Sequence, residues 1–340
     1  MKTTAVVILN WNGREMLEKF LPSVIRHSAV PGVEVIVADN GSADDSLKFL
    51  KEKFPEIRTI PLDKNYGFAG GYNRALELVE ADYFILLNSD VEVTADWISP
   101  LIHTLEGNEK VVACMPKIRS HVRREYFEYA GAAGGFMDKY GYAFCRGRIF
   151  DHVEKDHGQY DEPVEIFWAT GACMCIRAGA FREAGGFDER FFAHMEEIDL
   201  CWRLQNAGYS IMVNPQSLVY HYGGGALPPE NPYKTFLNFR NNLLMLFKNL
   251  NTTQLFTVFP VRIILDWLSV IKFLASFRFR HIWAVFKAHL SFLVMLPAYI
   301  RLRKKIPKRV LHTNLTGVYK GSIVWRFFIR RRQKYSEILE

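Results

Sequence analysis

Residues 5–12 read Ala5-Val6-Val7-Ile8-Leu9-Asn10-Trp11-Asn12, a short apolar run that passes directly into polar residues. An uninterrupted apolar run of this length predicts a strand buried on both faces. The pattern returns at Val33–Ala38, which ends in Asp39-Asn40-Gly41-Ser42, and at Tyr83–Leu87, which ends in Asn88-Ser89-Asp90. Polar residues therefore follow each of three predicted buried strands.

Helical patterns alternate with these strands. The predicted helices are Arg14–His27, Asp44–Lys53, Gly70–Glu80 and Glu196–Asn206, and the further predicted strands are Ile57–Leu62 and Gly171–Ile176. This alternation predicts an α/β fold, with a Rossmann-like, mainly parallel sheet flanked by helices. Ligands bind such sheets at the carboxyl ends of the strands, so we expect a site where the polar ends meet.

The charge of the chain is distributed unevenly. Residues 1–229 carry 23 Lys and Arg against 32 Asp and Glu, a net charge of −9, whereas residues 230–340 carry 20 against 4, a net charge of +16. The composition, 49% hydrophobic and 23% charged, excludes a disordered or collagen-like chain. We therefore expect a folded domain over 1–229 and a basic helical region over 230–340 that suits an anionic surface.

The basic region interleaves apolar and charged residues. The segments Gln254–Ser276 and His281–Ile300 both contain charged side chains, so neither is a strong candidate to span a membrane. Their pattern favours amphipathic helices that lie in the membrane interface, and the basic run Arg301–Arg309 suits anionic lipid headgroups. The alternative is a helical bundle packed on the core with a solvated basic face. Nucleic acid is not an expected partner, because no nucleic-acid module accompanies the charge.

The cysteines and the first residues of the chain indicate where in the cell the protein is located. Cys114, Cys145, Cys173, Cys175 and Cys201 include no C-x-x-C pair, which favours buried thiols in a reducing compartment. The first residues lack the features of a signal peptide, so we expect a cytoplasmic location.

Several polar residues have a chemical and a purely structural interpretation. Asp90 suits a divalent cation that bridges phosphates, or it caps a turn. Asp39 suits a base N–H or a ribose hydroxyl, or it closes an Asx turn. The glycine-rich stretch Lys64–Arg74 lets backbone N–H groups approach a ligand, or it is a tight loop on the sheet. His221 suits a metal or diphosphate and Arg240 a phosphate, although either residue fits a structural role.

Three carboxylates gather at the start of the predicted helix Glu196–Asn206. Glu196, Asp199 and Arg203 share one helix face, whereas Glu197 points elsewhere, which would suit a general base aimed into a cleft. The alternative is an acidic first turn, favoured by the helix dipole and paired with Arg203.

Taken in order, these segments resemble family 2 glycosyltransferases of the GT-A fold, and within them the bacterial rhamnosyltransferase-type enzymes that build cell-surface polysaccharides. The resemblance covers roughly residues 4–225. The matching segments are Val6–Asn12, Val37–Ser42, Asn65–Asn73, Leu87–Val91, Gly171-Ala172, Gly185–Asp188 and Phe191–Asp199.

The resemblance implies a role for each matched position. Asp39 would hold the nucleotide base with Asn12 near it, Asp90 would bind Mg²⁺ or Mn²⁺, and His221 would lie at the metal and diphosphate. Glu197 would be the catalytic base and Glu196 would orient the site. The other residues expected to bind the nucleotide-sugar are Asn10, Asn65, Gly70, Asn73, Asn88 and Arg240, and Trp168, Thr170 and Gly171 would line the acceptor side.

Two departures from the family pattern matter. The metal motif is Asn88-Ser89-Asp90 rather than Asp-x-Asp, which leaves Asp90 as the single carboxylate there. The acidic pair is Glu196-Glu197 where Glu-Asp is usual, so Glu196, Glu197 and Asp199 all remain candidates for the base.

The resemblance implies an inverting transfer of a sugar from a dTDP- or UDP-sugar to a hydroxyl of a growing cell-surface glycan. An acceptor carried on a polyprenyl diphosphate would explain a basic, aromatic tail at the inner membrane face. Two alternatives remain open. One is a nucleotidyltransferase, which the absence of a Lys/Arg-rich glycine loop near the N-terminus disfavours; the other is a catalytically inactive, membrane-associated nucleotide-binding scaffold.

Overall fold

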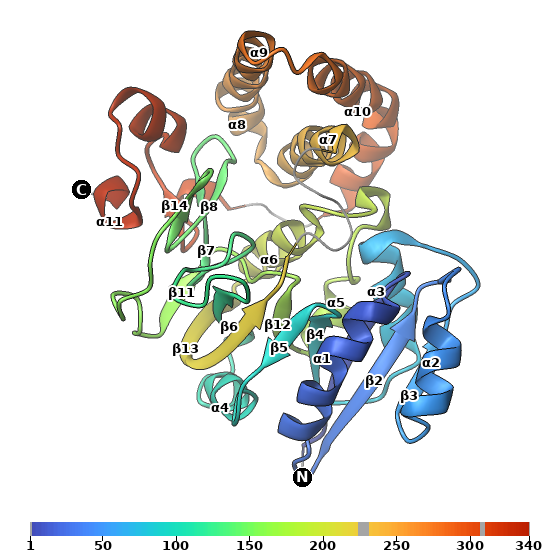
Figure 1. The fold of residues 1–340 in the computed structure, drawn as a ribbon. Coiled ribbons are helices and arrows are strands. Elements are labelled where there is room, and N and C mark those ends of the chain that lie inside the picture. Colours follow the sequence, from blue (N-terminus) through green and yellow to red (C-terminus); the bar gives the residue numbers. More distant parts are fainter. Residues whose placement is uncertain (1, 224–230, 307–309, 340) are drawn as a thin grey trace.

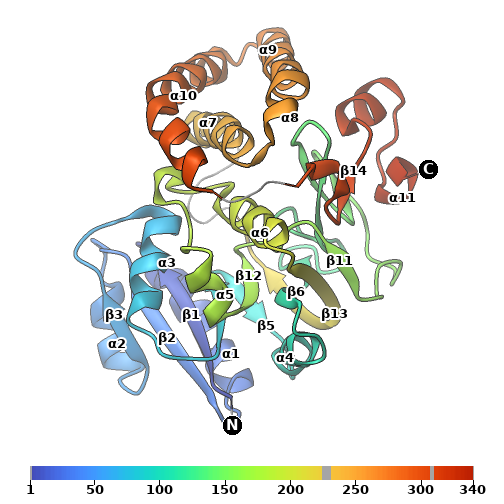
Figure 2. The same ribbon diagram turned by 180° about the vertical axis from the view of Figure 1, so that it is seen from behind.

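A mixed sheet forms the centre of the protein (Figures 1 and 2). The computed structural model describes residues 2–223, 231–306 and 310–339. The strand order is β11-β13-β6-β12-β4-β1-β2-β3, with β5 paired to β13. These strands are β1 (Thr4–Asn10), β2 (Val33–Asp39), β3 (Arg58–Pro61), β4 (Tyr83–Asn88), β5 (Val91–Val93), β6 (Val111–Ser120), β11 (Val164–Ile166), β12 (Cys173–Arg177) and β13 (Ser210–His221). The mainly parallel α/β sheet expected from the sequence is confirmed, since β1 to β4 run parallel.

Apolar side chains explain why these segments lie in the core. β1 and β4 are buried along almost their whole length. The flanking helices are α1 (Arg14–His27), α2 (Ser46–Lys53), α3 (Gly67–Glu77), α4 (Ser99–Glu106), α5 (Ala178–Glu183) and α6 (Glu196–Asn206). α1 covers the face of the sheet that is nearer in Figure 1, whereas α3 and α5 cover the opposite face, which is nearer in Figure 2.

The register of the parallel strands brings their polar ends together. Asn10 at the end of β1 pairs with Asp39 at the end of β2, and Leu9 pairs with Asn88 at the end of β4. The three polar segments expected at one edge of the sheet therefore do meet there.

A smaller sheet joins the C-terminal segment to the core. Its order is β10-β9-β8-β7-β14, and β14 lies parallel to β7. The strands are β7 (Gly135–Asp138), β8 (Ala143–Cys145), β9 (Arg148–Ile149), β10 (His152–Val153) and β14 (Val318–Tyr319). The short elements around this sheet and the site are the 3₁₀ turns Glu189–Phe191 and His312–Asn314, the π-helical turn Trp325–Ile329 and α11 (Tyr335–Leu339).

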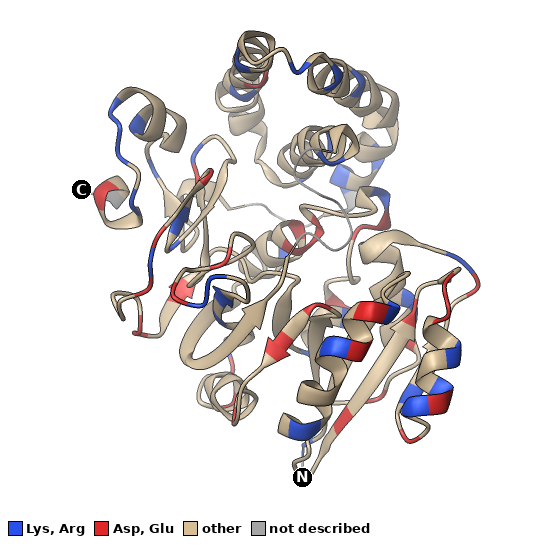
Figure 3. Ribbon diagram, viewed as in Figure 1, with Lys and Arg blue, Asp and Glu red and all other residues tan. Residues whose placement is uncertain are grey.

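Four helices lie across the carboxyl end of the sheet (Figure 1). They are α7 (Pro232–Asn249), α8 (Thr252–Thr257), α9 (Phe259–Ala275) and α10 (Phe279–Lys305). Arg262 of α9 donates to Asp266 at 2.7 Å and to the carbonyl of Gly141 at 3.2 Å, and Tyr299 of α10 donates to Asp188 at 3.1 Å. Figure 3 shows Lys and Arg on α9, α10 and the C-terminal segment. The basic region thus packs on the core.

The structure corrects the expectations at two places. Neither tail segment is a strong membrane-span candidate by sequence, but α10 extends beyond 281–300, and its stretch Phe279–Lys304 is long and apolar enough to cross a membrane by length and composition alone. Helix α3 begins at Gly67 rather than Gly70, because the Asn65 side chain accepts from the Gly67 N–H at 2.7 Å and starts the turn earlier. The expected domain boundary at 229/230 falls in 224–230, outside the described residues.

Candidate functional site

The ends of β1 and β2 form a fixed polar corner. Asp39 is fully buried and accepts from Asn10 Nδ2 at 3.0 Å, Ser42 Oγ at 2.7 Å and the Ser42 N–H at 2.9 Å. Exposed Asn12 accepts from the Ala43 N–H at 2.7 Å and has a positive φ of 50°. Asp39 therefore closes the turn that the sequence suggested, and the same bonds hold its carboxylate at the ligand edge of the sheet.

The glycine-rich stretch is held by amides. Asn65 Oδ1 accepts from Asn40 Nδ2 at 3.1 Å as well as from Gly67. Gly67 has φ of +71°, and a Cβ there would lie 2.4 Å from the carbonyl oxygen of Phe192. A Cβ on Gly70 would lie 3.1 Å from Tyr66 Cβ. Glycine is thus required where this loop meets the residues before α6.

Asn73 makes a different connection from the one expected. Its side-chain amide donates to the Phe187 carbonyl and accepts from the Phe187 N–H, both at 2.9 Å. These reciprocal bonds tie α3 to the segment before α6, which favours a supporting role for Asn73 over contact with a nucleotide.

Asp90 and His221 lie together next to the end of β4. Their Oδ1 and Nε2 atoms are 3.0 Å apart, and Asn88 Nδ2 lies 3.5 Å from the same nitrogen. Glu128, which the sequence did not single out, lies 3.3 Å from His221 Nδ1. The exposed fractions of Asp90, His221 and Glu128 are 7%, 6% and 8%, so this is a buried acid–imidazole–acid row.

The charges in this row compensate one another. Burial alone would lower the pKa of His221, but Glu128 and Asp90 outweigh it and raise that pKa to about 10. Burial likewise opposes ionisation of Asp90, yet His221 keeps its pKa below the usual range. Asp90 is therefore a carboxylate at neutral pH.

Asp90 and His221 fit a divalent cation if phosphate oxygens of the substrate supply its other ligands. Among the described residues, no three His, Cys, Asp or Glu side chains are grouped to hold a metal on their own. Asp90 offers a carboxylate oxygen, the ligand that Mg²⁺ and Mn²⁺ prefer, and His221 offers one nitrogen once it is deprotonated. Mg²⁺ typically takes one or two protein carboxylates beside substrate phosphates, so the residues suit a shared site.

The acidic pair begins α6 after a strained turn. Phe192, His194 and Met195 have φ of 65°, 71° and 75°. Such conformations cost on the order of 1–3 kcal/mol each in non-glycine residues and cluster at functional sites. The turn delivers Glu196 and Glu197 as the first residues of α6.

Glu196 and Glu197 differ in how deeply they are buried and in how far their pKa values are raised. Glu196 is 3% exposed; its burial and the neighbouring Glu197 hold its pKa well above the usual range. Burial raises the pKa of Glu197 to about 7. Glu197 is half-buried, and neither its Oε2 atom nor that of Glu196 has a hydrogen-bond partner among the residues that the structure describes. Glu197 therefore has the properties of a base that works near neutral pH.

Asp199 and Arg240 are both engaged within the protein. The fully buried Asp199 accepts from Arg203, Lys248 and Asn249, each at 2.8 Å, and despite its burial the two cations keep its pKa below the usual range. Arg240 donates to the carbonyls of Arg190 and Phe191 at 3.1 Å. These bonds favour structural roles for both side chains.

The residues expected on the acceptor side are buried. Trp168 is 4% exposed and donates through Nε1 to the Phe136 carbonyl at 2.9 Å. Thr170 is 3% exposed, and a Cβ on Gly171 would lie 2.6 Å from the Phe68 ring. These residues shape the site from beneath.

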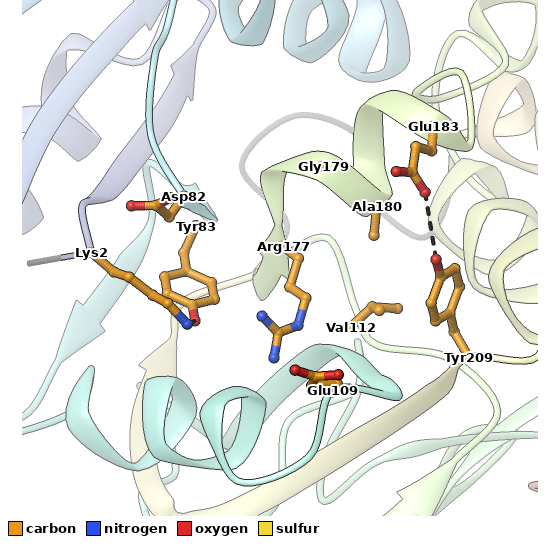
Figure 4. Close-up of a pocket in the computed structure, with 10 residues that line it drawn as sticks. All are labelled: Lys2, Asp82, Tyr83, Glu109, Val112, Arg177, Gly179, Ala180, Glu183 and Tyr209. Atoms are coloured by element: carbon orange, nitrogen blue, oxygen red, sulfur yellow. Dashed lines mark hydrogen bonds between the residues drawn. The ribbon is translucent and has the colours of Figure 1, made fainter.

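A pocket of about 350 Å³ lies at the opposite edge of the sheet (Figure 4). Lys2, Tyr83 and Arg177 line it, and Glu183 accepts from Tyr209 at 3.5 Å beside them. Because Tyr83 begins β4, this pocket is at the amino ends of the parallel strands, away from the polar ends described above.

Sequence reasoning missed Glu128, Asn40, Asn241, Lys248 and Asn249. Their partners are backbone carbonyls or side chains far away in the sequence. No motif marks them in a single sequence.

Comparisons with known proteins agree with this geometry. The chain is 28% identical over 232 residues to an N-acetylglucosaminyl-diphospho-decaprenol L-rhamnosyltransferase of Mycobacterium tuberculosis, covering 64% of this chain and 75% of that protein. It is 23% identical over 247 residues to a low-salt glycan biosynthesis hexosyltransferase of Haloferax volcanii, covering 71% and 74%.

Two solved structures share the fold. GalNAc-T7 with UDP, GalNAc and Mn²⁺ matches with a TM-score of 0.57 and 16% identity, over 74% of this chain and 49% of that one. A mannosyltransferase from Pyrobaculum calidifontis with GDP-Man and Mn²⁺ matches with a TM-score of 0.52 and 12% identity, over 87% and 76%. These likenesses confirm the expected GT-A fold. The family model described as Glycosyl transferase family 2 matches residues 5–183, more than half of the sequence, and the chain therefore belongs to this family of inverting glycosyltransferases.

Proposed function

We propose that this enzyme transfers a sugar from a dTDP- or UDP-sugar to a hydroxyl of a glycan carried on a polyprenyl diphosphate. The observation that carries the proposal is the pairing of Asp90 and His221 beside the strand ends that also present Asp39. The Mycobacterium relative is named for a diphospho-decaprenol acceptor, and both structural neighbours hold a nucleotide with Mn²⁺.

Asp90 and His221 would hold Mg²⁺ or Mn²⁺, which offsets the charge that develops on the leaving diphosphate. Asp39 and Asn12 would face the base and ribose of the donor. Asn65 and Gly70 would border the donor at the start of α3, where Asn65 accepts from the Gly67 N–H and Gly70 lies in the first turn of the helix. Asn10 holds Asp39 in place, and Asn88 lies beside His221.

Glu197 would act as the general base. Its carboxylate takes the proton from the acceptor hydroxyl, whose oxygen bonds to the anomeric carbon as the bond from that carbon to the diphosphate oxygen breaks. Attack from the face opposite the leaving group inverts the configuration. Glu196 and Asp199 are weaker candidates, since Glu196 is more deeply buried than Glu197 and Asp199 is held by two cations.

The tail would hold the enzyme on the inner face of the membrane, where a lipid-linked acceptor lies. α9 and α10 expose large apolar side chains in a protein surface that also carries Lys and Arg (Figure 3). These apolar side chains include Ile264, Trp267, Leu268, Ile271 and Leu274 on α9, and Phe279, Trp283, Leu290, Leu293 and Val294 on α10. Apolar and basic groups together suit an anionic membrane interface. Of the basic run 301–309, residues 307–309 lie outside the described residues.

Donor binding and transfer, measured on the same variants, test this proposal. We expect thermal stabilisation by a UDP- or dTDP-sugar with Mn²⁺, and Asp90→Ala to lose the metal-dependent part. Glu197→Gln should keep the stabilisation and lower kcat by about 10²–10⁴-fold. Transfer is followed as radiolabelled sugar in the extracted polyprenyl lipid. Absence of any donor-induced stabilisation, or release of inorganic pyrophosphate instead of a nucleoside diphosphate, would overturn the proposal.

A further inference from the structure

One asparagine of the C-terminal region contacts the turn that carries the acidic pair. Asn241 of α7 is fully buried, and its Nδ2 donates to the carbonyls of Phe191, Ala193 and His194 at 2.9, 2.8 and 2.8 Å. Its Oδ1 accepts from Arg240 Nε at 2.9 Å. An amide carries two protons, so three acceptors at these distances share them, and both ends of the side chain are engaged.

The turn needs such support because its backbone is strained. Phe192, His194 and Met195 all adopt a positive φ, which persists in non-glycine residues only when the surroundings hold it. Met195 is the N-cap of α6 and gives no side-chain cap, so α6 holds the turn through backbone bonds such as that from the Asp199 N–H to the Met195 carbonyl at 2.9 Å. From the other side, the Phe192 carbonyl accepts from the Ala69 N–H at 3.2 Å, which ties the turn to the start of α3.

α7 also holds α6 one turn further along. Lys248 Nζ and Asn249 Nδ2 both donate to Asp199 at 2.8 Å. Helix α7 therefore contacts the residues before and after Glu196 and Glu197. A shift of α7 would change the direction in which these two side chains point.

We propose that Asn241 is a positioning residue for the reaction: by holding the turn over 191–195, it fixes the direction in which Glu197 meets the acceptor hydroxyl. Arg240, which donates to carbonyls at the same turn, acts with it. The proposal rests on the proposed function, because a share in turnover follows only if Glu197 is the base.

The neighbouring asparagine provides a matched control. Asn242 is 2% exposed, and its Nδ2 donates to the Gly141 carbonyl at 2.9 Å, in the hairpin between β7 and β8. Its approach to the turn is limited to Met195 Sδ at 3.9 Å. Asn241→Ala and Asn242→Ala thus remove the same group from adjacent buried positions, but only Asn241→Ala releases the turn.

The test compares kcat, KM for the donor and Tm of the full-length variants. We expect both variants to lose Tm, Asn241→Ala the more because it leaves more buried groups unpaired, and only Asn241→Ala to lose kcat, by about 10–100-fold, with donor KM within about twofold of wild type. Hydrogen exchange of the amides of 192–197 should be faster in Asn241→Ala alone. Equal kcat losses in the two variants, or a loss confined to KM, would overturn the positioning role.

Glu197→Gln, measured alongside, separates the two proposals. If it keeps full turnover, the assigned base is wrong and the positioning role falls with it. If it is inactive while Asn241→Ala keeps the kcat of wild type, only the positioning role is refuted.

Discussion

Lys248 joins the C-terminal region to the catalytic core, and its replacement by methionine should weaken the whole fold. Its Nζ lies 3.0 Å from Asp188 Oδ2 and 2.8 Å from Asp199 Oδ2. The side chains of the three residues are 5%, 6% and 0% exposed, so water cannot replace the lost cation. Methionine has a similar volume and leaves the two carboxylates without their shared positive charge.

The magnitude follows from the partners that remain. Removing one member of a buried ion pair costs about 3–5 kcal/mol. Asp199 keeps Arg203 and Asn249, and Asp188 keeps the Tyr299 hydroxyl at 3.1 Å, so we expect the lower end, about 3 kcal/mol. At about 2 °C per kcal/mol for a chain of this length, Tm should fall by roughly 6 °C.

Differential scanning calorimetry and urea unfolding measure this loss. Lys272→Met is the control, because Lys272 is exposed on α9, and surface changes stay within about 0.5 kcal/mol. Adding Asp199→Asn to Lys248→Met removes the uncompensated carboxylate, so the double variant should lose less than the sum of the single losses. A loss below about 1 kcal/mol for Lys248→Met, or strict additivity in the double variant, would contradict this account of the buried cation.

Three further predictions concern the base, the glycine turn and the membrane face. Glu197 must be deprotonated to act as the proposed base, and burial raises its pKa to about 7, so kcat should fall below about pH 7 and level off above it. The raised pKa also means that the free energy of unfolding falls as pH rises to about 7, because the unfolded state loses this proton at a lower pH. Glu197→Gln should therefore raise Tm at pH 8, and an unchanged Tm would contradict the burial of the group. Gly67→Ala should lower the free energy of unfolding, measured in urea, by at least about 1–2 kcal/mol, because Gly67 has a positive φ. Gly179→Ala, in a helix and with no atom within 4 Å of the added Cβ, should raise that free energy by about 0.4–1 kcal/mol. Equal effects of the two substitutions would refute the strain argument. Trp283→Glu with Val294→Glu, both on exposed α10 positions, should abolish co-sedimentation with phosphatidylglycerol vesicles while leaving Tm unchanged, and retained binding would place the membrane contact elsewhere.

Patterns that repeat along one element were readable from the sequence. α1 begins and ends at the predicted residues, because Leu17, Phe20, Leu21 and Val24 form one buried stripe at helical spacing. The continuous apolar runs of β1 and β4 predicted strands buried on both faces, and the polar residues that follow them do lie at one edge. These helices and strands could be predicted because their patterns lie within one continuous segment of the sequence.

Contacts between distant segments were not readable. The smaller sheet contains strands of two to four residues, too short for an alternation to stand out. Glu128 reaches His221 because its N–H donates to the Ile118 carbonyl of β6, which pairs with β13. Asn241 acts on backbone carbonyls, which every residue possesses. Side chains whose partners are carbonyls leave no pattern of residue types.

The family match ends before the last residues of the candidate site. The match covers 5–183, which includes the strand ends that present Asp39 and Asp90, but Glu197 and His221 come later. The turn before Glu197 is held from one side by α3, which lies inside the match, and from the other by α7, which lies outside it. If Asp39 and Asp90 bind the donor as proposed, this binding should persist in relatives whose C-terminal helices differ, whereas the direction of the proposed base Glu197 should depend on how α7 packs. On this argument, exchanging 231–306 between relatives should alter kcat for a given acceptor more than affinity for the donor.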